Sequence, residues 1–321
     1  MTKEDQTILV WAPRYDTDLA ALGIEKPFAL DRGELVLKEL EKDYGQQIPV
    51  IEPKPITDED LLLVHTPQYL QTLHESNTWK EIFELSEEEY FPERATRPLT
   101  DLLDDIKFKS GGTLLAVELA LQHGLAANLG GGYHHAFPDH GHGFCAIHDI
   151  AIAICSVQKR GLVKRVMVVD LDFHQGDGTA VTFANDPNVF TLSVHSEEGW
   201  PETKQKSSLD VGIMSRDADR YLEKTKQALS EALKQFEPEL VVYVAGSDPY
   251  ELDVLSGTSF IRLPLETMKQ RDEMVIDLFV DKCVPLAMVF AGGYGPHVWK
   301  VHYLAVVHLL KRAGILDAQP V

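Results

Sequence analysis

Short apolar segments rich in valine and isoleucine recur along this chain and alternate with segments of helical pattern. We expect strands at 8–11, 126–129, 166–170, 189–194, 240–245 and 286–291. Several of them are apolar on both faces, which is typical of a buried parallel strand. Strands that alternate with helices predict an α/β fold, in which a parallel sheet is covered on both faces and the functional site lies beyond the carboxyl ends of its strands.

Helices are expected between these strands, at 112–123, 219–236 and 266–280. In 219–236 the apolar residues gather near one face and the charges lie elsewhere. The segment 79–106 is polar, acidic and less regular, so we expect a long surface excursion there, with a rim or lid over the site as the alternative. A length of 321 residues suits one large α/β domain or two small ones.

The chain is strongly acidic, with 50 Asp and Glu residues against 30 Lys and Arg residues and a formal charge of −20. Such a surface repels nucleic acid and anionic membranes and attracts a cationic substrate or a basic protein tail. Its 3 cysteines form no C-x-x-C motif, which argues against a disulfide framework and for a reducing compartment. We expect a cytoplasmic protein, because the sequence shows neither a signal-peptide pattern nor an apolar run of about 18 residues.

Polar residues and glycines follow four of the expected strands directly. The sequence reads DLDFHQGDG over 170–178, GSDP over 246–249, GGGYHH over 130–135 and GGYG over 292–295. Because the carboxyl ends of parallel strands meet at one edge of a sheet, we expect these carboxylates, imidazoles, glycines and the phenol to gather there.

Asp172, His174 and Asp248 are the candidate metal ligands. Asp172 and His174 are two residues apart in an extended segment, so their side chains point to the same side. Asp248 follows another strand and can supply a third ligand. Two carboxylates and one imidazole leave positions open for water and substrate, as a catalytic zinc site requires. The alternative is a solvated turn, which a D-x-D-x-H motif alone does not exclude.

A metal-activated water still needs a proton acceptor. The adjacent His134 and His135 are the candidates, and Asp170 and Asp177 are carboxylates that can fix their tautomers. An isolated pair of histidines is more often a surface or core feature, but this pair follows three glycines at a strand end.

Glycines are suited to a crowded site. Those at 130–132 let the backbone approach a ligand closely or adopt a positive φ. Gly292 and Gly293 would place Tyr294 on a sharp bend, from which its hydroxyl can donate a hydrogen bond to the oxyanion of a tetrahedral intermediate. A tyrosine in a surface turn is the alternative.

Four strings of the chain together resemble the zinc-dependent histone deacetylase family, in order and spacing, over residues 8–310. They are GGGYHHAFPDHGHGFCAIHD, VVDLDFHQGDG, AGSDPYELD and AGGYG. The HQGDG and FPDHGHGFC stretches are more similar to class IV and bacterial members than to class I. The resemblance implies a three-layer α/β/α arrangement around a central, mostly parallel eight-stranded sheet, which is the arginase/deacetylase fold. It also implies one catalytic domain spanning 1–321.

The resemblance also implies the roles of individual residues. The zinc ligands would be Asp172, His174 and Asp248; the histidine pair His134 and His135, with His135 as general base; the orienting carboxylates Asp170 and Asp177; and the transition-state tyrosine Tyr294. Contacts to the substrate, in a tunnel for acyl-lysine, would come from Gly132, Gly143, Phe144, Trp200 and Gly293. A structural potassium ion would use Asp170, Asp172, His174 and Ser193, and Arg32 matches a basic position of an internal acetate channel.

The chain departs from the family pattern at three places. Lys26-Pro27 stands where the family has His-Pro, and His140 and His142 are not fixed features of the family. The rim aspartate that holds the substrate backbone cannot be placed, although 79–106 is its natural location. These departures bear on substrate identity and not on the metal chemistry.

The sequence therefore predicts hydrolysis of an Nε-acyl-lysine in a protein or peptide. An acetylpolyamine amidohydrolase would apply the same chemistry to an acylated polyamine. A non-catalytic acyl-lysine-binding protein is disfavoured because the ligands, the base and the tyrosine are all present. A two-metal ureohydrolase is disfavoured because Gly176 and Tyr250 stand where its additional acidic ligands would be. Zinc is the favoured metal, with iron(II) or cobalt(II) as alternatives; acyl length and oligomeric state are left open.

Overall fold

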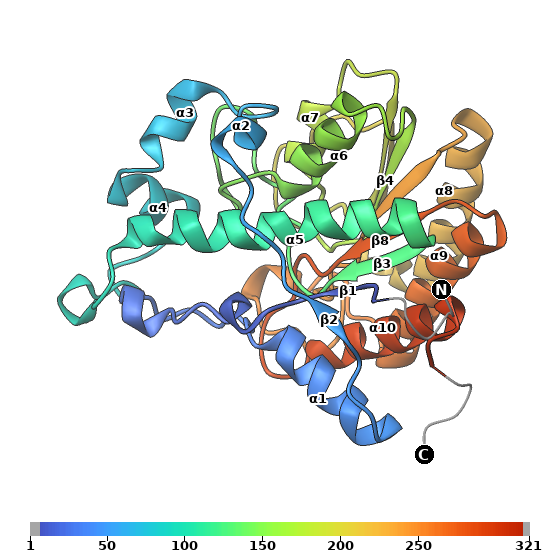
Figure 1. The fold of residues 1–321 in the computed structure, drawn as a ribbon, viewed down its shortest axis with the longest axis horizontal. Helices are drawn as coiled ribbons and strands as arrows, with labels where there is room; N and C mark the ends of the chain where they lie inside the picture. The colour runs from blue at the N-terminus through green and yellow to red at the C-terminus, as the bar shows by residue number, and fades with distance from the viewer. Residues whose placement is uncertain (1–6, 317–321) are drawn as a thin grey trace.

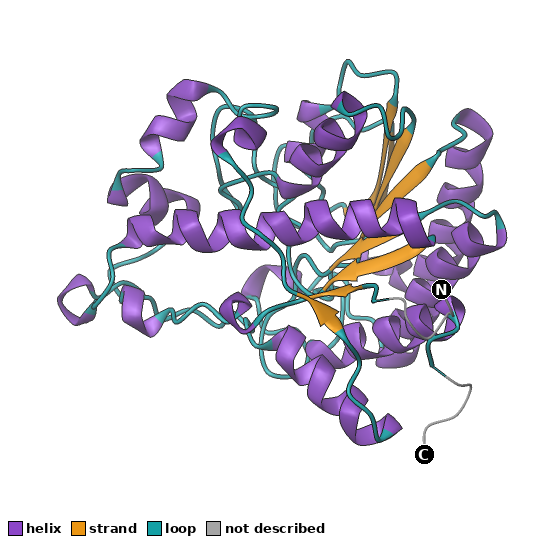
Figure 2. Ribbon diagram, in the orientation of Figure 1, coloured by secondary structure: helices purple, strands orange, loops and turns teal. Residues whose placement is uncertain are grey.

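A single sheet of eight strands lies between two layers of helices in the computed structural model, which describes residues 7–316 (Figures 1 and 2). The strands are β1 (Leu9–Val10), β2 (Val50–Ile51), β3 (Leu125–Asn128), β4 (Val166–Asp170), β5 (Val189–Ser196), β6 (Leu209–Ile213), β7 (Leu240–Val244) and β8 (Leu286–Val289). Their order is β2-β1-β3-β8-β7-β4-β5-β6, and every neighbouring pair is parallel. The expected three-layer α/β/α fold is confirmed.

Helices cover both faces of this sheet. They are α1 (Arg32–Tyr44), α2 (Asp58–Leu61), α3 (Pro67–Thr72), α4 (Ser76–Ile82), α5 (Leu102–His123), α6 (Asp149–Lys159), α7 (Asp177–Thr182), α8 (Tyr221–Gln235), α9 (Leu265–Asp281) and α10 (Trp299–Ala313). Short 3-10 helices lie at Pro13–Tyr15, Ala20–Leu22, Pro92–Arg94, Leu99–Asp101, Ser215–Arg220 and Ser256–Thr258. On one face α5 packs against α6, β3 and β8; on the other α1, α10, α9 and α8 pack as successive neighbours (Figure 1).

The two strands that the sequence did not predict are the edge strands of the sheet. β2 is only two residues long, and β6 is largely half-exposed, so neither shows the continuous apolar run of a buried strand. The central strands β4 and β7 are buried along their whole length, which is why their pattern was clear.

Helix α5 begins at Leu102 and not at residue 112, where the sequence pattern placed its start. Two consecutive glycines, which disfavour a helix interior, hid its first half. Gly111 is needed because a Cβ there would lie 1.8 Å from the backbone oxygen of Lys54. Asp104 and Asp105 stabilise the first turn through the helix dipole.

The structure corrects part of the expectation that 79–106 is a surface excursion: residues 84–98 are exposed or half-buried, but buried residues lie at both ends of the segment. Helix α4 ends and α5 begins within this segment, and Trp79 is fully buried. A second apolar cluster forms here, and its members include Trp79, Ile82, Phe83, Leu99, Leu102 and Ile106. Acidic residues lie between these apolar positions, so the sequence pattern indicated a polar segment and did not predict the buried cluster.

No helix among residues 7–316 combines the length and the apolar character needed to cross a membrane.

Candidate metal centre and active site

The site residues follow four strands that are immediate neighbours in the sheet, β3, β8, β7 and β4. The loop after β3 carries the histidine pair, the loop after β4 carries Asp172 and His174, the loop after β7 carries Asp248, and the loop after β8 carries Tyr294. Because all four strands are parallel, their carboxyl ends lie at one edge. Segments that are far apart in the sequence thus meet in one place.

Asp172, His174 and Asp248 form a buried group whose ligand atoms all lie within 4.8 Å of one another. His174 Nδ1 is 2.9 Å from Asp248 Oδ2 and 3.2 Å from Asp172 Oδ1. The backbone N–H groups of Phe173 and Gly292 donate to Asp248 Oδ1 and Asp172 Oδ2, each at 2.9 Å. These donors fix both carboxylates in place.

The electrostatics of this group favour a bound cation. Burial and the charge of Asp172 raise the pKa of Asp248 to about 7. Burial lowers the pKa of His174, but hydrogen bonds to the two carboxylates outweigh it and raise that pKa to about 9. Two carboxylates buried side by side therefore need positive charge between them. One imidazole and two carboxylates with an open side suit zinc, so the residues present fit this metal.

Each histidine of the pair is held by its own carboxylate. His134 Nδ1 lies 2.7 Å from Asp170 Oδ2, and His135 Nδ1 lies 2.7 Å from Asp177 Oδ1. Burial and the charge of His134 lower the pKa of His135 to about 3. Burial also lowers the pKa of His134, but the charges of Asp170 and Asp172 outweigh it and raise that pKa to about 10. At neutral pH His135 is thus a free base, and His134 is held beside it by Asp170.

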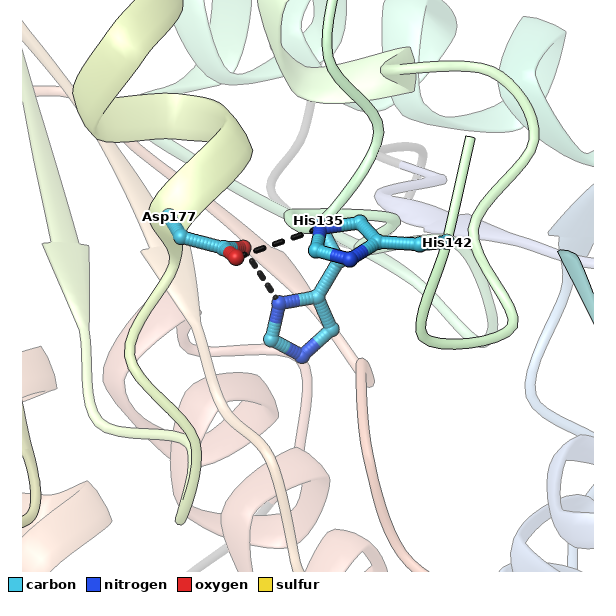
Figure 3. Close-up of side chains that lie close together, drawn as sticks. All are labelled: His135, His142 and Asp177. Atoms are coloured by element: carbon cyan, nitrogen blue, oxygen red, sulfur yellow. Dashed lines mark hydrogen bonds and ion pairs between the residues drawn. The ribbon is translucent and has the colours of Figure 1, made fainter. Parts of the chain in front are cut away.

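Asp177 faces a second imidazole that the sequence did not single out as functional. His142 Nε2 lies 3.1 Å from Asp177 Oδ2, on the other carboxylate oxygen from His135 (Figure 3). Burial raises the pKa of Asp177, but the hydrogen bond to His135 and the close approach of His142 lower it overall below its usual range. His140, the other histidine of this loop, is exposed and stacks on Phe137.

Tyr294 is half-buried beside the metal group and stays protonated. Burial and the charges of Asp248 and Asp172 raise its pKa well above the usual range. Its backbone N–H donates to Asp253 Oδ2 at 2.7 Å, and its backbone pairs with that of Phe28. The hydroxyl is therefore a donor at neutral pH, on a backbone held from two sides.

Two of the predicted glycines lie where other side chains cannot fit. Gly132 has φ +90°, and a Cβ there would be 2.7 Å from Ala291. Gly293 has φ +133°, and a Cβ there would be 2.0 Å from Ser247 Oγ. Gly132 therefore lets the loop after β3 approach the loop after β8, and Gly293 lets the loop after β8 approach the loop after β7.

Phe144 lies in an aromatic cluster with Phe28 and Phe83, at ring-centroid distances of 5.0 and 6.5 Å. Phe28 and Phe83 were not identified from the sequence, since no motif marks either of them. Trp200 packs edge-on against His135, with ring centroids 4.7 Å apart, and a Cβ on Gly143 would touch it. The role of Trp200 as a facing tunnel wall stays a prediction.

One cavity of about 140 Å³ extends from Gly143 and Phe144, past the metal group, to Arg32 and Lys109. Arg32 donates from Nη2 to the backbone oxygen of Ala291 at 2.9 Å and from Nη1 to that of Gly292 at 3.0 Å. Arg32 thus lines the same cavity as the metal group, and its place in an internal channel stays a prediction. The potassium ion stays a prediction: Asp170 and Ser193 are register partners across β4 and β5, and Ser193 Oγ is 2.9 Å from His195 Nδ1.

Comparison with known proteins gives consistent matches. Residues 26–310 match the family described as "Histone deacetylase domain". The chain is 33% identical to "Histone deacetylase 2" of Arabidopsis thaliana, over 97% of this chain and 80% of that protein. It is 31% identical to "Acetoin utilization protein AcuC" of Bacillus subtilis, over 92% of this chain and 79% of that protein. The crystal structure of an HDAC homolog complexed with SAHA has the same fold, with a TM-score of 0.71 at 24% identity, over 97% of this chain and 84% of that one.

Proposed function

Because the chain belongs to the histone deacetylase family and has the arginase/deacetylase fold, we propose that residues 1–321 form one zinc-dependent catalytic domain that removes acyl groups from Nε-acyl-lysine. The family consists of deacetylase hydrolases, which supports hydrolysis of an acylated amine by this chain. The observation that carries it is the meeting of the buried Asp172–His174–Asp248 group with two histidine–aspartate pairs at one sheet edge.

Asp172, His174 and Asp248 would hold the zinc ion. The chemistry supplied by a bound zinc ion would be polarisation of the acyl carbonyl and a lowering of the pKa of water toward about 7. The chain supplies the remaining chemistry. A structural potassium ion would in addition be held by Asp170, Asp172, His174 and Ser193.

His135 takes the proton from the attacking water, because it is neutral and Asp177 accepts from its Nδ1 and leaves Nε2 free. Tyr294 donates its hydroxyl proton in a hydrogen bond to the oxyanion that forms on the acyl oxygen. A protonated histidine of the pair then gives a proton to the leaving amine. Asp170 holds the ring of His134 in place through its Nδ1 atom during these steps.

The substrate lysine would pass beside Phe144, whose neighbours Phe28 and Phe83 extend the apolar wall. Gly143 and Trp200 would line the opposite side, and Gly132 and Gly293 let the backbone approach the acyl group. Lys26 Nζ lies 5.3 Å from the centre of the Phe144 ring and bonds Glu89 at 3.1 Å. Because Glu89 pairs with this cation, Lys26 adds no net charge to the wall, and the choice between acyl-lysine and an acetylated polyamine rests on the substrate panel.

The test is an amide-hydrolysis panel on the zinc-loaded protein, read by mass spectrometry, with acetyl-lysine peptide, long-chain acyl-lysine peptide and acetylated polyamine. Each substrate is run with and without a strong chelator. We expect turnover of an acyl-lysine peptide that the chelator abolishes and added zinc restores. Turnover that survives the chelator, or turnover of the polyamine alone, contradicts the proposal. Binding of an acyl-lysine peptide without hydrolysis would indicate a non-catalytic reader.

A further inference from the structure

The cavity does not end at the catalytic residues but continues along one face of α5. Leu102, Ile106 and Lys109 all line it and occupy successive turns of the helix. At 1.5 Å per residue, Lys109 lies roughly 10 Å along the helix from Leu102. The wall of the inner cavity thus changes from apolar to cationic over a few turns.

Lys109 is a buried cation with spare hydrogen-bond donors. It is 8% exposed, and its Nζ donates to Thr17 Oγ1 at 2.9 Å. Among residues 7–316 no carboxylate forms an ion pair with it. The nearby Asp105 bonds Arg14 and Arg97 instead, at 3.2 Å each. An ammonium has three N–H donors, so two of them remain free to bind a ligand in the cavity.

We propose that Lys109 makes this enzyme selective for acyl groups that end in a carboxylate, such as succinyl or glutaryl groups on lysine. The inference rests on the proposed function and names the acyl class for the same site. The methylene groups of the acyl chain would lie against Ile106, which is about 4.5 Å along the helix from Lys109. The terminal carboxylate would accept from Lys109 and from the Thr17 hydroxyl, whose oxygen already accepts from Lys109.

A carboxylate suits this position better than a methyl group does. A purely apolar acyl chain would cover the buried ammonium and leave its free N–H groups without partners, which is costly. A carboxylate supplies charge-assisted hydrogen bonds to the same groups. Burial, with a contribution from the charge of Arg32, lowers the pKa of Lys109 to about 8 although Asp105 and Asp16 raise it, so an arriving anion also relieves an unfavourable burial.

The reaction needs no additional reactant. The oxygen of water bonds to the acyl carbon, the carbon–nitrogen bond breaks, and the lysine amine leaves with a proton. The products are a dicarboxylate and an unmodified lysine side chain.

The test compares two peptides that differ only at the end of the acyl chain. One carries glutaryl-lysine, and the other carries the terminal carboxamide of the same length, so only the charge differs. We expect the zinc-loaded protein to have a kcat/KM at least about tenfold higher for the carboxylate, the scale of a hydrogen bond to a charged group. In Lys109→Met this ratio should fall to about one or below. A series from malonyl to adipoyl would give the preferred length.

The matched control is Lys107→Met, on the same helix, because Lys107 bonds Asp58 at 2.7 Å and is not part of the cavity wall. It should keep the wild-type ratio, and melting temperatures verify that both variants fold. If the wild type hydrolyses acetyl-lysine but shows no carboxylate preference, the inference is wrong and the proposed function stands. If Lys109→Met slows both peptides equally, Lys109 guides product anions or shapes the cavity, and the inference is again wrong. If no acyl-lysine is hydrolysed, the proposed function fails.

Discussion

Replacing Tyr294 with phenylalanine removes one hydroxyl and leaves the rest of its environment intact. The ring keeps its contacts with Phe28 and Phe144, at centroid distances of 5.9 and 6.0 Å, and the backbone keeps its hydrogen bond to Asp253. The hydroxyl makes no hydrogen bond to another residue in the range 7–316, so the free energy of unfolding should change by less than about 0.5 kcal/mol.

The catalytic effect of Tyr294→Phe should be much larger. Loss of one oxyanion donor costs about 10² to 10³ in kcat, or roughly 3–4 kcal/mol of transition-state stabilisation. KM should change little, because the oxyanion exists only beyond the ground state. Steady-state hydrolysis of an acetyl-lysine peptide, with zinc content verified, measures both constants.

Tyr69→Phe is the matched control for Tyr294→Phe. The hydroxyl of Tyr69 donates to the backbone oxygen of Ala146 at 2.6 Å, and Tyr69 is not part of the cavity wall. This variant should lose about 1 kcal/mol of the free energy of unfolding and keep its kcat. Tyr294→Phe should show the opposite, with unchanged stability and a reduced kcat. A Tyr294→Phe enzyme that turns over within threefold of wild type would refute the oxyanion role.

Three further predictions concern the residues around the metal group and the inner cavity. Asp177→Asn should lower kcat by about 10² or more, because an amide no longer holds His135 in the required tautomer. The zinc content should stay normal. An unchanged kcat would contradict the role of Asp177 in orienting His135. Gly132→Ala should lower the free energy of unfolding by about 1–3 kcal/mol, read by thermal unfolding, because its φ of +90° and the 2.7 Å approach to Ala291 exclude a Cβ. Burial lowers the pKa of Lys109 from 10.5 to about 8, so the folded protein binds this proton less tightly than the unfolded chain does. The free energy of unfolding is lowered fully below pH 8, and this loss disappears as the pH rises toward 10.5. Lys109→Met should therefore be up to about 3 kcal/mol more stable than wild type at pH 7. Near pH 10.5 it should be no more stable than wild type. Urea unfolding at the two pH values measures this difference, and a wild type that is the more stable at pH 7 would contradict it.

The parts of the site that could be predicted are those set by local sequence and strand direction. Asp172 and His174 share a side because they are two residues apart in an extended segment. Asp248 joins them because it follows another parallel strand, and parallel strands end at the same edge. Neither inference needs knowledge of the packing between layers.

The parts that could not be predicted depend on packing or on unusual backbone. His142 reaches Asp177 from a loop in which Gly143 and Phe144 have φ values of +54° and +66°, a conformation that the sequence does not announce for Phe144. Phe83 and Lys109 reach the cavity only because the segment around α5 packs inward. A polar stretch with buried apolar positions gives no periodic signal of that packing.

The position of β8 has a consequence for how the protein is made. β8 is the last strand in the sequence, yet it lies between β3 and β7 in the middle of the sheet. Until residues 286–289 have been synthesised, β3 and β7 each present an unpaired edge, and unpaired edges invite pairing with other chains. The three metal ligands follow β4 and β7, which pair directly, but the histidine pair and Tyr294 can join them only when β8 closes the gap, and exposure of the two edges to aggregation ends at the same point.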